Sequence, residues 1–124
     1  MLQIMMQLPD QAIDRVASYF QALAEPTRLR ILSLLRQEEH NVGELAEACG
    51  YTAANMSRHL AVLMQQGFVK REGRGTSVYY QIADPTIYAL CDLVCDRIAQ
   101  QHSAQAWPSV MPVKKRSITA RRVA

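Results

Sequence analysis

The segment from Thr52 to His59 carries the side chains whose types and spacing suggest a chemistry most clearly. Asn and Arg side chains can hydrogen-bond base edges in the DNA major groove, and Ser and Thr hydroxyls can bond bases or phosphates. The small residue Ala53 would let the helix backbone come close to such a surface. We therefore expect DNA contacts from Thr52, Asn55, Ser57, Arg58 and His59. For His59, packing beneath the helix is an alternative interpretation.

A second basic group follows between residues 70 and 76. Its two glycines permit the positive-φ conformations of a tight turn. A basic turn is suited to lie along a phosphate backbone, because phosphate contacts supply much of the affinity for DNA. The candidates for these contacts are Lys70, Arg71, Arg74 and Thr76. A module that binds protein instead of DNA would be expected to lack arginine here, so the basic turn argues against that alternative.

Two thiols form the third candidate group. Cys91 and Cys95 are four residues apart, which places them on one face of a helix. Two thiolates can begin a site for trivalent arsenic or antimony, which prefer sulfur ligands, or they can form an inter-chain disulfide. Packing is the favoured interpretation, because both lie in an apolar stripe and free cysteine is often buried. The adjoining Asp92 and Asp96 would raise the pKa of the thiols rather than lower it.

Catalytic patterns are missing from the sequence. It holds no Ser/His/Asp set, no glycine-rich phosphate loop and no pair of carboxylates in an apolar setting, so we do not expect an enzyme. Glu38, Glu39 and His40 are expected to lie in a solvated loop. Cys49 is expected in the core, and no two histidines have the spacing of metal ligands.

The elements that must position the DNA-contacting groups can be predicted from local patterns. Apolar residues recurring at i, i+3, i+4 and i+7 predict a helix over residues 42–49. Gly50 is suited to end it in a left-handed conformation, and Thr52 is suited to cap the next helix. That second helix should turn Met56, Leu63 and either His59 or Leu60 inward, and it should end at Gly67.

A hairpin is predicted directly after these helices. Phe68 and Val69 begin its first strand, and residues 76–82 form the return strand, which is rich in β-branched and aromatic residues. The alternation of this strand places three apolar side chains on one face and leaves the other face in solvent. The inward residues are Val78, Tyr80 and Ile82.

Three more helices complete the predicted fold, which is mainly α with a small β-hairpin wing, a winged helix-turn-helix of five helices. Asp10 can cap the first helix, Pro26 suits the first turn of the second, and Asp84 with Pro85 marks the start of the last. The second helix should be central to the core, with Leu29, Ile31, Leu32, Leu34 and Leu35. Apolar stripes on the first and last helices exceed what so small a domain can cover, so we expect a homodimer built on them. The stripe of the first helix consists of Ile13, Val16, Ala17, Phe20 and Leu23, and that of the last helix of Ile87, Leu90, Cys91, Val94, Cys95 and Ile98.

Composition agrees with a globular DNA-binding protein. The chain has 124 residues, 49% of them hydrophobic, which suits one folded domain. Residues 51–83 hold four basic and one acidic side chain, and residues 103–124 hold five basic and none acidic. We expect one domain over residues 1–102 and a flexible basic tail over 103–124. With no apolar run of about 20 residues and no signal-peptide pattern, the expected location is the cytoplasm.

The motifs together resemble the ArsR/SmtB family of winged-helix repressors. The resembling stretches are ALAEPTRLRILSLL and VGELAEACGYTAANMSRHLAVLMQQGFVKREGRGTSVYYQI, and the likeness covers about two thirds of the chain. Three motifs carry it, A-x-x-x-R-L-x-I-L-x-L-L, S-R-H-L-x-x-L and G-x-x-V-Y-Y, which are specific in combination and weak singly. The resemblance implies a dimeric bacterial transcription factor that represses an operon and releases its DNA when a ligand binds. Because a dimer carries two DNA-contacting helices, its operator in double-stranded DNA is expected to be an imperfect inverted repeat.

The ligand sites that the resemblance implies are mostly missing. Where some members carry a Cys-Val-Cys pair, this chain has Asn41-Val42-Gly43. The zinc site on the last helix keeps Asp84 alone, with Thr86, Arg97 and Gln100 at the other positions, so the usual zinc site is expected to be absent. Ser33 stands where sulfur-responsive members place a cysteine. Some arsenic-responsive members carry thiols on the last helix, as Cys91 and Cys95 would. A regulator that senses no metal, with purely structural cysteines, is the alternative.

Overall fold

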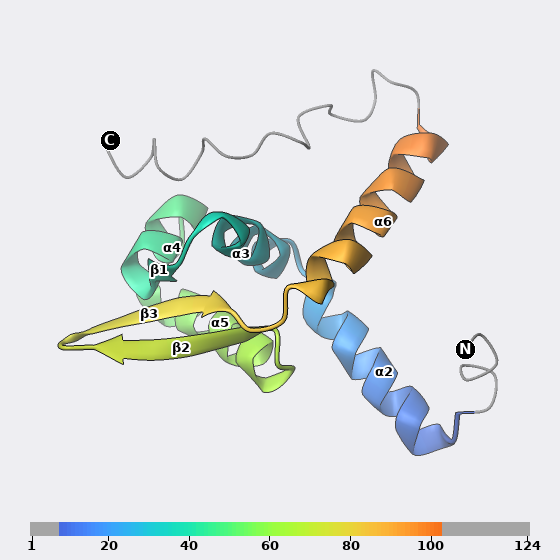
Figure 1. Ribbon diagram of the computed structural model, residues 1–124, viewed down its shortest axis with the longest axis horizontal. Coiled ribbons are helices and arrows are strands. Elements are labelled where there is room, and N and C mark those ends of the chain that lie inside the picture. Colours follow the sequence, from blue (N-terminus) through green and yellow to red (C-terminus); the bar gives the residue numbers. More distant parts are fainter. Residues whose placement is uncertain (1–7, 103–124) are drawn as a thin grey trace.

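The computed structural model describes residues 8–102, which form five helices and a three-stranded sheet (Figure 1). In chain order the elements are α2 (Asp10–Leu23), α3 (Pro26–Gln37), β1 (His40–Asn41), α4 (Val42–Cys49), α5 (Ala53–Gln65), β2 (Val69–Arg74), β3 (Ser77–Ile82) and α6 (Thr86–Gln101). The predicted class, mainly α with a small β-hairpin, is confirmed. The boundary predicted between residues 1–102 and a tail of 103–124 concerns residues outside the described range and stays a prediction.

Helix α3 lies at the centre of the core. Pro26 takes its first position, as predicted, and the Glu25 carboxylate caps it by accepting a hydrogen bond of 3.1 Å from the Arg28 backbone N–H. Ile31 is fully buried, and the neighbouring leucines at 32, 34 and 35 are buried with it. The expected burial of Leu29 is wrong, because this residue faces the opposite side of the helix from Ile31 and is 43% exposed.

The helix-turn-helix forms through the predicted local signals. Gly50 ends α4 with a φ of 72°, a left-handed conformation that glycine adopts without strain. The Thr52 hydroxyl caps α5 by accepting the Asn55 backbone N–H at 3.1 Å. Met56, Leu60 and Leu63 are fully buried, so the inward face of α5 is fixed by its apolar residues. Packing therefore holds the outward face of α5 at a set orientation.

The wing is a three-stranded sheet rather than a hairpin alone, with strand order β1-β3-β2. Strand β1 is short and was not expected; it pairs antiparallel with the middle of β3, His40 opposite Tyr80. Arg74 pairs with Ser77 across the tip of the hairpin, where Gly75 has a φ of 64°. The outer face of β3 is half-buried rather than solvated, because the side chains of Glu39, Glu72 and Arg74 lie against its Tyr79 and Gln81.

His40 corrects the expectation of a solvated loop. Its side chain is fully buried, and its Nδ1 lies 3.0 Å from a carboxylate oxygen of Glu44. The same oxygen accepts the Asn41 backbone N–H at 3.3 Å, and the Asn41 side chain accepts the Glu44 backbone N–H at 2.8 Å. This capping box binds β1 to the start of α4. The imidazole is buried because the pairing of β1 with β3 carries it beneath the sheet.

Helices α2 and α6 extend from the body on the side away from the wing tip (Figure 1). Asp10 lies inside α2 and makes no capping bond; Pro9 is the cap residue, which corrects the predicted role of Asp10. Asp84 does act at the start of α6, where its carboxylate accepts the Thr86 backbone N–H at 3.0 Å. Among the described residues, no helix is long and apolar enough to span a membrane.

Candidate nucleic-acid interface

The outward face of α5 presents polar side chains without a cover from other described elements. Asn55, Ser57 and Arg58 are all exposed, and so are the alanines at 53 and 54. One guanidinium nitrogen of Arg58 donates to the Asn55 side-chain oxygen at 3.3 Å. Because an arginine carries five N–H donors, this bond orients the guanidinium and leaves most of its donors available. The pair thus presents hydrogen-bond donors on the exposed face of α5.

His59 lies at the edge of this face, where it is held from below. A guanidinium nitrogen of Arg28 lies 3.3 Å from its Nδ1. Arginine can only donate, so Nδ1 must accept, and the ring hydrogen then resides on Nε2. The Tyr51 ring lies 6.0 Å from the imidazole, centroid to centroid. Both interpretations of His59 thus have support, because the ring packs under the helix and still presents a donor on its other side.

Arg28 is a functional candidate that the sequence did not reveal. Besides His59, its guanidinium donates to two carbonyls at the end of α2, those of Ala22 at 2.7 Å and Gln21 at 3.3 Å. It therefore joins α2 to α5 across α3. From the sequence, Arg28 is only a polar residue in the first turn of a helix. Its hydrogen-bond partners lie six, seven and 31 positions away, so no local pattern reveals them.

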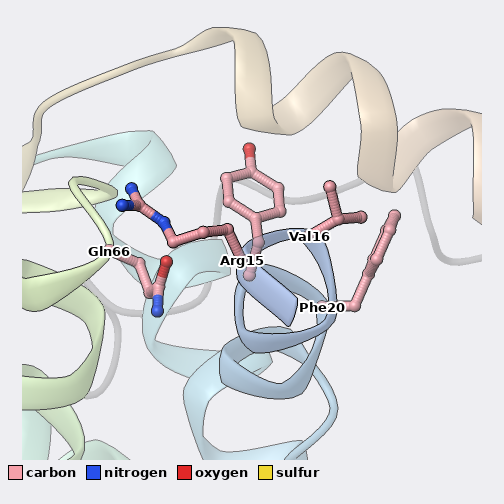
Figure 2. A pocket seen from close by; sticks show the side chains of 5 residues that line it. Arg15, Val16, Phe20 and Gln66 are labelled. Atoms are coloured by element: carbon pink, nitrogen blue, oxygen red, sulfur yellow. The ribbon is translucent and has the colours of Figure 1, made fainter. Parts of the chain in front are cut away.

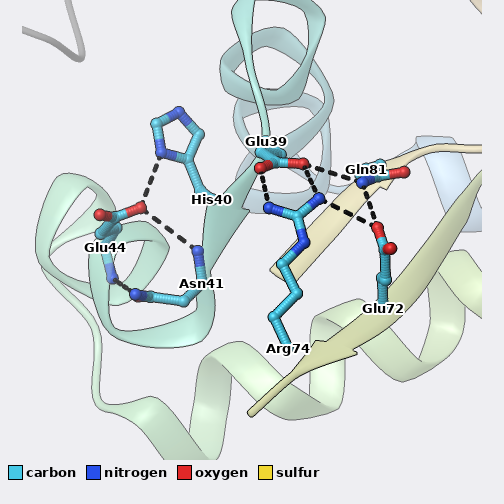
Figure 3. Close-up of polar contacts among 7 residues, drawn as sticks. All are labelled: Glu39, His40, Asn41, Glu44, Glu72, Arg74 and Gln81. Carbon is cyan, nitrogen blue, oxygen red and sulfur yellow. Dashed lines mark hydrogen bonds and ion pairs between the residues drawn. The ribbon is translucent and has the colours of Figure 1, made fainter. Parts of the chain in front are cut away.

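The four wing residues expected to contact phosphate, Lys70, Arg71, Arg74 and Thr76, are all exposed. Arg74 differs from the other three in its carboxylate partners. Its guanidinium lies along the outer face of the sheet and forms an ion pair with both carboxylate oxygens of Glu39 and one with Glu72 at 3.0 Å (Figure 3). Its guanidinium carbon lies 5.0 Å from the centre of the Tyr79 ring. Arg74, one of the four wing residues expected to contact phosphate, is thus already paired with carboxylates of the protein.

Gln81 closes the network around Arg74. Its side-chain N–H₂ donates to Glu39 at 2.8 Å and to Glu72 at 2.9 Å. Hydrogen bonds from Arg74 and Gln81 lower the pKa of the Glu39 carboxyl below its ordinary value, and those from Glu39 and Glu72 raise the pKa of the Arg74 guanidinium. Glu39 is therefore part of a structured ion pair and not the solvated loop charge that was expected.

The two thiols of α6 are half-buried and unbridged, and Cys91 packs against the core. Burial raises the pKa of both, and neighbouring negative groups add to it: Cys95 and Asp92 around Cys91, and Asp92 and Asp96 around Cys95. Arg36 opposes the shift at Cys91, and it also binds Asp92 through two hydrogen bonds of 3.1 Å. In the described residues no three His, Cys, Asp or Glu side chains gather as a metal site. Cys49, which was expected in the core, is half-buried and packs against it.

Apolar side chains stand exposed on both outer helices. Phe20 on α2 is 50% exposed, and Leu93 and Val94 on α6 are 67% and 49% exposed. An open groove of about 700 Å³ is lined by Arg15, Val16, Tyr19 and Phe20 of α2 and by Gln66, which follows α5 (Figure 2). Only Leu23 of the predicted α2 stripe is buried. Of the stripe predicted on α6, Ile87 is buried, Val94 is exposed and the other four members are half-buried, while the exposed Leu93 lies outside it.

Comparison with protein families gives a match over the central elements. A model of the family described as bacterial regulatory protein, arsR family, matches residues 25–71, from the cap of α3 to the start of the wing. The chain is 37% identical over 91 residues to a transcriptional repressor SmtB homolog of Synechocystis, covering 73% of this chain and 68% of that protein. It is 41% identical over 85 residues to the regulator NmtR of Mycobacterium tuberculosis, covering 68% and 71%.

Solved structures agree with these relatives. The homodimeric winged helix-turn-helix DNA-binding domain Mb0332 of Mycobacterium bovis has a TM-score of 0.66 at 35% identity, covering 75% of this chain and 89% of that one. The crystal structure of Mycobacterium tuberculosis Rv0081 has a TM-score of 0.67 at 29% identity, covering 95% and 100%. The winged helix-turn-helix architecture predicted from the sequence is confirmed.

Proposed function

Because the chain belongs to the arsR family of bacterial regulatory proteins, and is a DNA-binding transcriptional regulator, we propose that it represses transcription as a homodimer on an inverted-repeat operator. The observation that carries the proposal is the uncovered polar face of α5, with Asn55 and Arg58 joined by a hydrogen bond. Buried apolar residues on the other face of α5 hold this pair at a fixed orientation. Since operator DNA of a bacterium lies in its cytoplasm, that is the proposed place of action.

The proposed DNA contacts divide between groove and backbone. Thr52, Asn55, Ser57 and Arg58 would enter the major groove, where amide and guanidinium groups distinguish base pairs. The Thr52 hydroxyl accepts the capping bond with its oxygen, so its own hydrogen remains a donor. His59 would donate its Nε2 hydrogen to a phosphate. Phosphate contacts from the wing come from its exposed residues Lys70, Arg71 and Thr76, and Arg74 is left out of this set because carboxylates engage it.

The proposed dimer rests on α2 and α6. Exposed apolar side chains on both helices would be covered by a second copy, and burial of apolar surface drives such association. The homodimeric Mycobacterium bovis domain supports this arrangement by its fold. Two copies would present two α5 helices related by a two-fold axis, and half-sites about one helical turn apart would match them.

The experiment that tests the proposal uses a duplex recovered with the full-length protein from a random-sequence DNA library. We expect Arg58→Ala to weaken binding to this duplex by roughly 1–3 kcal/mol at fixed salt, the size expected for removing a base-edge hydrogen bond. Arg30→Ala is the matched control, since Arg30 is an exposed arginine on α3. Equal affinities for wild type and Arg58→Ala would remove α5 as the reading element.

For the signal that releases DNA we propose the thiols of Cys91 and Cys95, with trivalent arsenic or antimony as the ligand. Both thiols are half-buried on α6, with Cys91 against the core, and two sulfurs four residues apart are ligands that these ions favour. Each sulfur–arsenic bond forms as a hydroxyl of arsenous acid leaves, and this hydroxyl combines with the thiol proton to give water. A partner copy would bring a second pair of thiols to the site.

This second proposal has its own test. The DNA-bound dimer is titrated with arsenite, antimonite, zinc, a persulfide and peroxide, and the titration is repeated with Cys91→Ser and Cys95→Ser. We expect release by arsenite or antimonite from the wild type and none from either variant. Release that survives both substitutions, or no release by any of these compounds, would leave the cysteines with a packing role.

A further inference from the structure

The carboxylate of Glu39 stands where a phosphate contact of Arg74 was expected. Glu39 ends the connection from α3 and precedes β1, while Arg74 ends β2 at the tip of the hairpin, 35 positions later. Lys70, Glu72 and Arg74 share the outer face of the sheet with Gln81, as their register with β3 requires. The Arg74 side chain runs back along that face from the tip toward β1 (Figure 3).

We propose that Glu39 is a positioning residue for DNA binding, which acts through Arg74 to hold the wing at the angle its exposed residues need. Arg74 then serves the sheet rather than the DNA. The inference rests on the proposed wing contacts of Lys70, Arg71 and Thr76. It assigns a favourable role in DNA binding to a negatively charged residue.

The contacts of β1 explain how Glu39 can set this angle. Asn41 and Glu44 form the capping box of α4, and the buried His40 ring contacts the same glutamate. Strand β1 is therefore fixed to the first helix of the helix-turn-helix. Glu39 adjoins this fixed point, so its ion pair with Arg74 transmits the position of α4 to the hairpin.

Charge balance argues against Arg74 leaving the network to bind phosphate. Two carboxylates, those of Glu39 and Glu72, surround the one guanidinium, and Gln81 donates to both of them. If Arg74 turned to DNA, two unpaired carboxylates would stay beside a polyanion, where like charges repel. The guanidinium would also move away from the Tyr79 ring, whose face attracts a cation.

The sign of the effect of Glu39→Gln on DNA affinity tests the proposal. Removing a negative charge near DNA would by itself tighten binding, and freeing Arg74 for a phosphate would also steepen the salt dependence. We expect the reverse for Glu39→Gln: roughly tenfold weaker binding at fixed salt, and a slope against salt that is shallower by about one for each phosphate that the wing no longer reaches. Glu47→Gln, the same charge change at an exposed site on α4, should not weaken binding.

A charge exchange keeps the test independent of folding. The double variant Glu39→Arg with Arg74→Glu restores an ion pair between the same positions, and we expect it to recover affinity relative to either single variant. Thermal unfolding and dimer mass of each variant are measured in parallel. Unchanged or tighter binding by Glu39→Gln overturns the proposal, as does a double variant no better than Arg74→Glu. If instead the wild type selects no duplex, or Arg58→Ala binds normally, the proposed function itself fails.

Discussion

Arg58 and Arg74 are both exposed arginines near the proposed DNA surface, yet their surroundings give them different roles. Arg58 touches one neutral amide oxygen, which orients it without neutralising it. Arg74 lies between two carboxylates, so its charge is already balanced within the protein. In the sequence, both residues contribute one positive charge to the same basic stretch, so charge patterns do not distinguish them. Only the neighbours in space decide which cation can serve a phosphate or a base.

At the same scale, the thiols of α6 give a prediction about pH. Burial and nearby negative groups raise the pKa of Cys91 and Cys95, so the folded protein holds their protons more tightly than the unfolded chain. The associated stability is complete below the unfolded pKa, about 8.5, and is lost as pH rises through the folded pKa.

Alkylation by iodoacetamide, followed for each cysteine by mass spectrometry between pH 7 and 10, checks this prediction. Because thiolate is the reactive form, we expect both sites to react more slowly than in urea-unfolded protein. The midpoint of each rate profile should lie above the value for the unfolded chain. A midpoint at or below that value would mean that the thiols are activated rather than suppressed.

At the scale of elements, local signals predicted the helices and the turns, but contacts distant in sequence escaped prediction. Gly50, Thr52 and Pro26 act on residues within one helical turn, so their effects can be read from the chain itself. Strand β1 forms only because β3 lies beside it, and two residues carry no strand pattern of their own. His40 is buried and Glu39 is paired for the same reason.

The contact between α2 and α5 through Arg28 gives a prediction about stability. Arg28→Met removes hydrogen bonds from a charged donor to two α2 carbonyls and to His59, so we expect a decrease of about 1–3 kcal/mol in the free energy of unfolding. Arg30→Met, on the same helix with an exposed side chain, should change it by less than about 0.5 kcal/mol. Urea unfolding at one fixed protein concentration compares them, because dimers gain stability with concentration. Equal decreases would show that Arg28 does not bind α2 to α5.

At the scale of the whole molecule, one chain leaves apolar surface uncovered on the helices that extend away from the wing (Figure 1). The sequence indicated this excess, because so small a domain cannot cover the apolar stripes of both its first and its last helix. It could not show which members of each stripe stay exposed. That depends on where α2 and α6 leave the body, as the exposure of Phe20 and Val94 illustrates.

Val94→Glu tests the role of this surface. A carboxylate in the centre of an apolar interface loses its hydration without a partner, so we expect the variant to sediment as a monomer while keeping its helical circular dichroism spectrum. Its affinity for a two-half-site duplex should fall. Gln100→Glu, the same added charge at an exposed position on α6, should remain dimeric. A dimeric Val94→Glu protein would place the interface elsewhere.

The central claim is that two copies of this chain read DNA together through α5 and the wing. Its most direct test is the symmetry of the duplexes that the full-length protein enriches from a random-sequence library. We expect an imperfect inverted repeat whose half-sites lie about 10–10.5 base pairs apart, or a multiple of that spacing, and weaker enrichment of that repeat by Arg58→Ala. Enrichment of a single unrepeated site, or equal enrichment of the repeat by Arg58→Ala, would contradict it.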